Sequence, residues 1–287
     1  MRYYSGVMNQ LYFPLALLLA CCAPQRSAAA PQPATPPAIQ RFVLPAVSPS
    51  AKEHAAYFPR LLKLALDKTV ASDGPYALAY YGQELTSLRR NTELKNNGVI
   101  NVMWDGTDRQ REAELLPVRI SLIKELNDYR VFLIRSEDAP RFAAVRTLDD
   151  LRRLKAGAGT NWPSTGVLRF NGLPVETSGG YEYLFPMLRV KRFDYMPRGA
   201  QEAWAELEQH PGEGLQVEST IFLHYRVPFY FFVSRSRPEL AARIERGLRL
   251  AKKDGSFERL FNSIPAFQRG MAEITARKRR VFELRQP

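Results

Sequence analysis

The stretch NVMWDGTDRQREAELLPVRISL, residues 101–122, gives the clearest indication of the fold. It continues an apolar segment, 99–104, that has the character of a buried strand. A polar loop with Thr107 follows directly, and then two arginines, Arg109 and Arg111. A guanidinium is permanently charged and can bind a carboxylate through two parallel hydrogen bonds. The stretch therefore predicts a strand that leads into a polar loop with two arginines.

Strand-like and helix-like segments alternate on both sides of this stretch. Apolar spacing predicts strands at 42–44, 76–81, 129–135, 193–196 and 229–234, and helices at 52–68, 86–95, 163–171, 179–191, 238–251 and 256–261. The segment Thr147–Asp150 has the spacing of a capping box at the head of another short helix. Such alternation, without an internal repeat, is typical of an α/β fold.

The first 30 residues have the composition of a secretory signal peptide. They contain an apolar run, 11–20, followed by small residues, and no Asp, Glu or Lys. The run is shorter than the roughly 20 apolar residues that span a bilayer. We therefore expect export to the periplasm, with a proline- and alanine-rich tether over residues 31–40 leading into the folded part.

Both cysteines of the chain, Cys21 and Cys22, lie in this leader. The exported protein would therefore have no thiol, which excludes a disulfide framework and a cysteine-ligated metal site. The segment Leu18–Cys21 also resembles the lipobox of bacterial lipoproteins, with Cys21 as the lipid-bearing residue. A cleaved soluble form and a form that contacts the membrane only through a lipid at Cys21 both stay open.

The chain is basic, with 41 Lys and Arg against 29 Asp and Glu. Its hydrophobic and charged fractions, 45% and 24%, exclude a disordered, collagen-like or multi-span membrane protein. The basic residues are dispersed apart from the cluster Arg277–Arg280, which we expect at a surface that faces solvent or an anionic membrane. We expect no nucleic-acid partner, because an exported protein meets little nucleic acid.

Four stretches, in this order, resemble solute-binding protein family 3, the extracytoplasmic receptors typified by the polar amino-acid-binding proteins of ABC transporters. They are residues 101–122, residues 148–162, Met187-Leu-Arg-Val-Lys-Arg-Phe-Asp194 and Asp254-Gly-Ser-Phe-Glu-Arg-Leu-Phe261. The resemblance covers about residues 41–267, and the segment Tyr195–Gly199 is similar to an uncharacterised branch of the family.

The resemblance implies a type II periplasmic-binding-protein-like fold, in which two α/β lobes are joined by two crossing hinge strands and the ligand lies in the cleft between the lobes. On this mapping, residues 41–128 and 237–287 form lobe one, and residues 129–236 form lobe two. The crossing strands would be Tyr129–Arg135 and Phe229–Ser234.

The resemblance also assigns candidate residues for binding an anionic group. Arg111 has the position of the family arginine that holds a ligand carboxylate, and Thr107 lies on the same loop. In lobe two a glycine-containing loop enters a helix, so its N–H groups and side chains are candidates for the same anion. Ordinary helix capping explains these side chains equally well. They are Thr160, Asn161, Ser164 and Thr165.

Two tryptophans and two charged residues complete the predicted ligand-binding site. Trp104 and Trp162 stand at the end of a strand and the start of a helix, where α/β proteins bind ligands, and are candidate walls. Arg198 and Glu202 follow the lobe-two strand that in the family supplies a residue for the ligand's amino group. Arg198, as a second arginine at the site, favours a ligand with two anionic groups. Glu202 has an alternative explanation, because an acidic residue is favourable near a helix N-terminus.

These features together predict a non-enzymatic receptor that captures a small polar, anionic, amino-acid-like solute for an ABC permease. A sensory receptor domain that presents its closed state to a membrane sensor is the alternative, and a cyclohexadienyl-dehydratase-like enzyme is a further one. The chain's 3 histidines show no metal-ligand spacing, and no nucleophile elbow or zinc-protease motif occurs. We expect a monomer with no cofactor, no metal and no catalytic residue.

Overall fold

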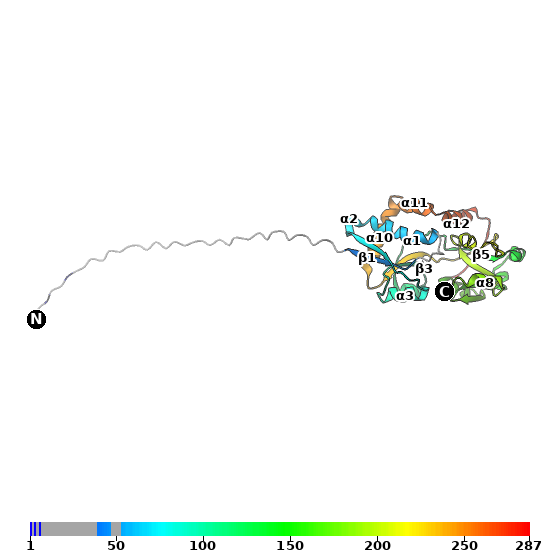
Figure 1. Cartoon of the computed structure of the whole chain (residues 1–287), viewed down its shortest axis with the longest axis horizontal. Helices are drawn as coiled ribbons and strands as arrows, with labels where there is room; N and C mark the ends of the chain where they lie inside the picture. Colours follow the sequence, from blue (N-terminus) through cyan, green and yellow to red (C-terminus); the bar gives the residue numbers. More distant parts are fainter. Residues whose placement is uncertain (2, 4–5, 7–38, 47–52) are drawn as a thin grey trace. The chain divides into compact units, whose positions relative to one another are not determined.

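The computed structural model describes residues 1, 3, 6, 39–46 and 53–287 (Figure 1). The predicted lipid-bearing Cys21, the predicted signal peptide apart from residues 1, 3 and 6, and residues 31–38 of the predicted tether lie outside the described residues. The chain divides into two units, Met1–Pro36 and Pro37–Pro287, and every helix and strand below belongs to the second unit.

The first lobe is built on two small sheets. β1 (Gln40–Leu44) and β2 (Tyr76–Tyr80) pair in parallel. β11 (Phe229–Ser234) lies between β3 (Met103–Gly106) and β4 (Leu115–Val118) and is antiparallel to both. Asn101 connects the two sheets, because its backbone N–H donates to the Val43 carbonyl and its side chain accepts from the Val43 N–H at 2.7 Å.

Helices from both ends of the unit pack on these sheets. They are α1 (Glu53–Asp67), α2 (Val70–Asp73), α3 (Ser87–Lys95), α4 (Arg109–Glu114), α10 (Pro238–Lys253), α11 (Ser256–Asn262) and α12 (Pro265–Ala276). Leucine and isoleucine side chains at helical spacing on α1 and α10 form one buried core with the strands. The two helices approach closely at Gly247, where an added Cβ would lie 2.0 Å from the Ala65 carbonyl oxygen.

The second lobe is built on a seven-stranded mixed sheet, counted over the described residues, in the order β12–β10–β5–β8–β6–β7, with β9 also paired to β5. The strands are β5 (Tyr129–Arg135), β6 (Ala156–Gly159), β7 (Val175–Ser178), β8 (Tyr195–Gly199), β9 (Leu215–Val217), β10 (Ile221–His224) and β12 (Arg280–Glu283). The predicted strands 129–135 and 229–234 are thus confirmed as β5 and β11.

Short helices connect the strands of this second sheet. They are the 3-10 helix Ser136–Asp138, α5 (Ala139–Ala143), α6 (Leu148–Arg152), α7 (Pro163–Phe170), α8 (Leu184–Arg189) and α9 (Ala203–Leu207). The predicted capping box is confirmed, because Thr147 and Asp150 exchange side-chain and backbone bonds at the start of α6. The helix predicted at 179–191 begins only at Leu184, since Gly179 and Gly180 favour a loop after β7.

The strand pairing departs from the predicted lobe boundaries at two places. β11 was expected to end lobe two, yet it lies inside the first sheet because Phe231 and Val233 pack into the α1–α10 core while Phe232 packs into a separate buried cluster. β12 was expected in lobe one, yet it pairs in parallel with β10 at the edge of the second sheet. We propose that the chain passes between the lobes at 119–128, at 225–228 and again after α12.

The basic cluster Arg277–Arg280 takes part in this last connection. Arg277 has φ +50° and turns the chain from the end of α12 toward β12. Arg279 is 8% exposed, lies over the rings of Phe222 and Trp204, and pairs with Glu273 at 3.1 Å. The prediction that the whole cluster faces solvent or a membrane is therefore wrong for Arg279, whose guanidinium packs inside the protein.

The turn between α10 and α11 contains an ion pair whose contribution to stability depends on pH. Lys68 Nζ lies 2.5 Å from Asp254 Oδ2, and Ser256 donates to Asp254 Oδ1 from its hydroxyl and its N–H. These contacts hold the pKa of Asp254 well below its ordinary value. A carboxylate with a depressed pKa stabilises the folded state above its unfolded pKa of about 4, and this contribution is lost as the pH falls below that value.

We therefore expect Asp254→Asn to lower the urea midpoint of unfolding at pH 7, and the difference from the wild type to shrink as the pH falls below about 4. The effect should be small, since the pair is partly exposed to water. Urea unfolding at several pH values between pH 7 and pH 3 measures it. A difference that does not change with pH would mean that the charge of Asp254 contributes nothing.

Candidate functional site

The first two connections between the lobes are hydrogen-bonded to each other. Asn127, 2% exposed, donates from Nδ2 to the Val227 carbonyl at 2.6 Å, and the Val227 N–H donates to Asp128 Oδ1 at 2.9 Å. The Tyr225 N–H donates to the Asp128 carbonyl at 3.0 Å. Burial raises the pKa of the Asp128 carboxyl, and the bond from Val227 only partly offsets it. The two connections thus form one local unit, which we call the crossover.

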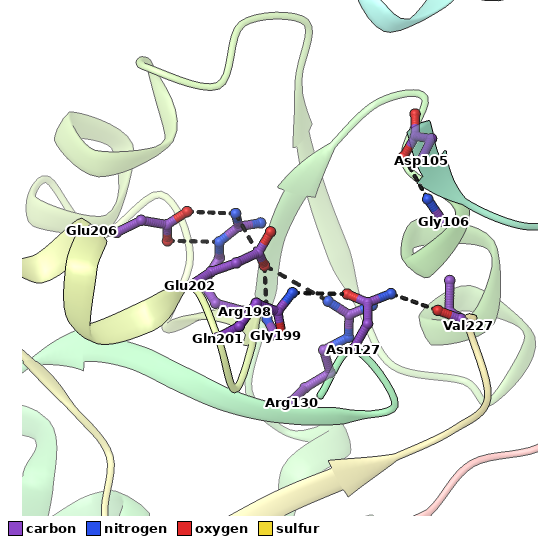
Figure 2. Close-up of polar contacts among 10 residues, drawn as sticks. All are labelled: Asp105, Gly106, Asn127, Arg130, Arg198, Gly199, Gln201, Glu202, Glu206 and Val227. Atoms are coloured by element: carbon purple, nitrogen blue, oxygen red, sulfur yellow. Dashed lines mark hydrogen bonds and ion pairs between the residues drawn. The ribbon is translucent and has the colours of Figure 1, made fainter. Parts of the chain in front are cut away.

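Four charged side chains gather in the second lobe beside the crossover (Figure 2). Arg198, near the end of β8, donates to Glu206 from Nε at 2.7 Å and from Nη2 at 2.5 Å. Its Nη2 also lies 3.2 Å from Glu202 Oε2. Glu202 accepts from the Gly199 N–H at 2.8 Å and lies 3.9 Å from Arg130 Nη1. We call Arg130, Arg198, Glu202 and Glu206 the charge cluster.

Arg198 is held tightly within the charge cluster. It is 8% exposed and its partner Glu206 is 3% exposed. The Arg198 guanidinium lies 4.7 Å from the Trp162 ring centre and 5.5 Å from that of Tyr181. Although burial alone would lower the pKa of Arg198, the Glu202 and Glu206 carboxylates raise it above its ordinary value. Arg198 is therefore permanently charged, and two of its donors are already used by Glu206.

Arg130 is held much more loosely. It lies near the start of β5, is 6% exposed, and places its guanidinium 5.4 Å from the Tyr225 ring centre. Its nearest carboxylate is that of Glu202 at 3.9 Å, and its Nε has no hydrogen-bond partner among the described residues. Arg130 was not among the predicted site residues, because it lies inside a predicted strand. The signal that was available is a positive charge directly before the apolar segment Val131–Ile134.

The loop predicted to bind an anion reaches the charge cluster only in part. Ser164 is 9% exposed and lies at the start of α7. Burial raises the pKa of the Tyr225 hydroxyl, whereas its interactions with Arg130 and Ser164 act to lower that pKa. Thr165 is 2% exposed and donates from Oγ1 to the Gly159 carbonyl at 2.7 Å, which closes the loop internally. Two more of the predicted residues, Thr160 and Asn161, are exposed.

In the first lobe, Arg111 lies in an internal network. It is 3% exposed, donates to the Gly106 carbonyl, and lies 3.3 Å from Asp105 Oδ2. The Arg111 N–H donates to the side chain of Asp108, the N-cap of α4, at 2.7 Å. These contacts fold the loop between β3 and α4 around the arginine. That Arg111 also contacts a ligand stays a prediction.

Thr107 and Trp104 have different surroundings. The Thr107 N–H donates to the Pro228 carbonyl at 3.0 Å, next to the crossover, while its hydroxyl donates to Glu112 at 2.7 Å. Trp104 is 8% exposed and stacks on Phe58 at 5.4 Å between ring centres, within the core of the first lobe. Its contact with a ligand also stays a prediction.

The structure therefore brings part of the predicted site together. Trp162, Ser164, Arg198 and Glu202 lie in or around the charge cluster, where Arg130 and Glu206 join them without having been predicted. Arg111 and Trp104 belong to the first lobe. Figure 2 shows Asp105 and Gly106 apart from the cluster and near Val227, and a Cβ added to Gly106 would lie 2.9 Å from Val227 Cγ1.

Two features are absent from the described part of the chain. No group of three or more His, Cys, Asp or Glu residues there is arranged to hold a metal ion. No helix there combines the length and the apolar character that crossing a membrane requires.

Comparison with known proteins gives matches among solved structures. No family model matches the chain, and no curated protein matches it. An ancestral arginine-binding protein bound to arginine has a TM-score of 0.59 at 16% identity, over 78% of this chain and 98% of that chain. A histidine kinase sensor domain with similarity to periplasmic binding proteins has a TM-score of 0.60 at 13% identity, over 79% and 96%.

A third similar structure comes from an ancestral amino-acid-binding protein described as a precursor of cyclohexadienyl dehydratase. Its TM-score is 0.57 at 13% identity, over 79% of this chain and 95% of that chain. At such identities the similarity shows the fold, which fits the two lobes, their mixed strand pairing and the crossover described above. The chain has the two-lobe α/β fold of the amino-acid-binding periplasmic proteins.

Proposed function

We propose that this protein binds a small polar, amino-acid-like solute with an anionic group between its two lobes, outside the cytoplasm. It would then deliver the solute to an ABC permease, or present its closed form to a membrane sensor. The fold supports this proposal, since proteins with this fold include receptors that bind arginine and a kinase sensor domain. The signal-peptide composition of residues 1–30 supports a place outside the cytoplasm.

The crossover is the observation that carries the proposal. Two connections that meet at one hydrogen-bonded unit, Asn127–Asp128 and Tyr225–Val227, allow two lobes to rotate about a common hinge. The charge cluster and the β3–α4 loop both lie next to this unit, one in each lobe. Groups placed on either side of a hinge contact a ligand together only when the lobes close, and closure is the state that a permease or a sensor would recognise.

The groups that we propose for contact with the solute come from both lobes. Thr107 and Arg111 are the first-lobe candidates, and Trp104 would act as a wall behind them. From the second lobe the candidates are Thr160, Asn161, Trp162, Ser164, Thr165, Arg198 and Glu202. The exposed side chains of Thr160 and Asn161 and the half-buried ring of Trp162 are the most accessible of the second-lobe candidates.

We expect a thermal-shift screen of the purified protein to find a stabilising solute among amino acids, monocarboxylates, dicarboxylates and polyamines. A ligand that binds only the folded state at about 100 times its dissociation constant adds about 2.7 kcal/mol to the free energy of unfolding. That corresponds to a rise in melting temperature of roughly 5–10 °C for a protein of this size. No shift with any of these compounds would contradict the proposal.

The same screen separates binding from catalysis. The precursor of cyclohexadienyl dehydratase among the similar structures makes a dehydratase the second candidate function. A binding protein returns its ligand unchanged, so we expect each stabilising compound, and prephenate-like acids added as further test compounds, to be recovered intact by mass spectrometry. Formation of a decarboxylated and dehydrated product from such an acid would favour the enzyme.

A further inference from the structure

The buried arginines beside the crossover differ in how well their guanidinium groups are paired. The Nε atoms of Arg111 and Arg130 both lack a hydrogen-bond partner among the described residues. However, Arg111 donates a hydrogen bond to the Gly106 carbonyl and lies 3.3 Å from the Asp105 carboxylate. Arg198 donates two hydrogen bonds to the Glu206 carboxylate. Arg130 has the Glu202 contact at 3.9 Å, lies over the ring of Tyr225 and interacts with the Tyr225 hydroxyl, and no carboxylate of the described residues lies within hydrogen-bond distance of it. Arg130 is thus a buried cation whose Nε donor is unused and whose guanidinium has no closely paired anion.

A buried charge that is poorly paired costs free energy, because the protein around it replaces the lost water only in part. Arg130 has about 6% of its surface exposed, so water reaches it only to a small extent. Groups that donate or accept hydrogen bonds surround it: Ser164 at the first turn of α7, Tyr225 at the crossover, and Glu202 after β8. An oxyanion that contacted the guanidinium would supply the missing acceptors and would also lie near the N-terminus of α7.

We propose that Arg130 binds the carboxylate of the solute, beside the pairs that Arg198 makes with Glu202 and Glu206. This inference rests on the proposed function and names the anion-binding residue of that same site. The charge cluster contains two arginines and two glutamates, so its formal charges cancel, and a dianion would meet Glu202 beside Arg130. The solute class is therefore a carboxylate with a cationic or hydrogen-bond-donating group that faces Glu202.

The test compares Arg130→Met with Arg226→Met, a matched change of an arginine that lies within the crossover but has an exposed side chain. Two quantities are measured for each variant and for the wild type: the melting temperature without ligand, and the dissociation constant by calorimetry for the strongest compound among the twenty amino acids, acetate, succinate and phosphate. We expect Arg130→Met to weaken binding roughly 100-fold or more. Its melting temperature without ligand should be equal to or above that of the wild type, since methionine replaces a poorly paired buried charge.

Arg226→Met should change neither quantity, and Arg130→Lys should retain part of the affinity because it keeps the positive charge. Arg130→Met with unchanged affinity would overturn this inference and leave the proposed function standing. A fall of many degrees in the melting temperature of Arg130→Met without ligand would show that Arg130 has a structural role, and would also overturn the inference. The inference would fail as well if the compound that binds most tightly had no carboxylate. A wild-type protein that binds none of the compounds would contradict the proposed function itself.

Discussion

Arg198→Met should lower the free energy of unfolding by about 3–5 kcal/mol, because it removes one partner from a buried ion pair and leaves the other uncompensated. Glu206 is 3% exposed and accepts both strong bonds from Arg198. Without the guanidinium, its carboxylate must either stay charged in a poorly solvated place or take up a proton. Chemical denaturation of the purified protein at pH 7 measures the loss.

The double variant Arg198→Met with Glu206→Leu is the control for this prediction. It removes both charges and keeps an apolar filling, so it should be more stable than the single variant Arg198→Met by a clear margin. Arg226→Met, at an exposed position, should change the free energy of unfolding by less than about 0.5 kcal/mol. A single variant Arg198→Met as stable as the wild type would contradict the tight pairing in the charge cluster.

Gly247→Ala should lower the free energy of unfolding by about 3 kcal/mol, at the upper end of the usual cost of inserting a group into a packed core. The added methyl group would lie 2.0 Å from the Ala65 carbonyl oxygen and 2.8 Å from the Ala65 Cα. These are backbone atoms of α1 and cannot move aside by a change of rotamer, so α1 and α10 must separate. The intrinsic preference of a helix for alanine over glycine, about 1 kcal/mol, is too small to offset this.

Gly166→Ala is the matched control, since this glycine lies inside α7 and a Cβ there would meet nothing within 4 Å. We expect it to leave the stability unchanged or to raise it by about 0.5–1 kcal/mol through the helix preference alone. Thermal and urea unfolding of both variants gives the comparison. Equal effects of the two substitutions would mean that α1 and α10 are not in close contact at Gly247.

The main strands and the longer helices follow from local patterns of the sequence. Tyr129–Arg135 and Phe229–Ser234 are predicted because bulky β-formers follow one another without a break, and both are strands in the structure. α10 is predicted from its leucine and isoleucine spacing. Such patterns report that a segment is buried. They do not indicate which sheet the segment joins, so the pairing of β11 with β3 and β4 and of β12 with β10 was not predicted.

The site was predictable where a loop follows a strand and unpredictable where a charge is buried inside a structural element. Trp162 and Glu202 follow strand ends, and Arg198 lies near the end of β8. The α/β rule selected Trp162, and the family resemblance selected Arg198 and Glu202; all three lie in or beside the charge cluster. Arg130 lies within a strand and Glu206 within a helix, where charged residues normally face solvent. The pairing of β5 with β8 places Arg130 opposite Gly199, next to Arg198, and Arg198 in turn pairs with Glu206.

The position of β11 has a consequence for the order in which the lobes fold. β11 completes the first sheet by pairing with β4, in contacts such as Phe231 with Val118, which lie more than a hundred residues apart along the chain. The second sheet, apart from its edge strand β12, is made from the continuous segment between β5 and β10. During synthesis this segment can fold before β11, the central strand of the three-stranded sheet in the first lobe, has been made. The lobe that is synthesised first should therefore be the one that matures last.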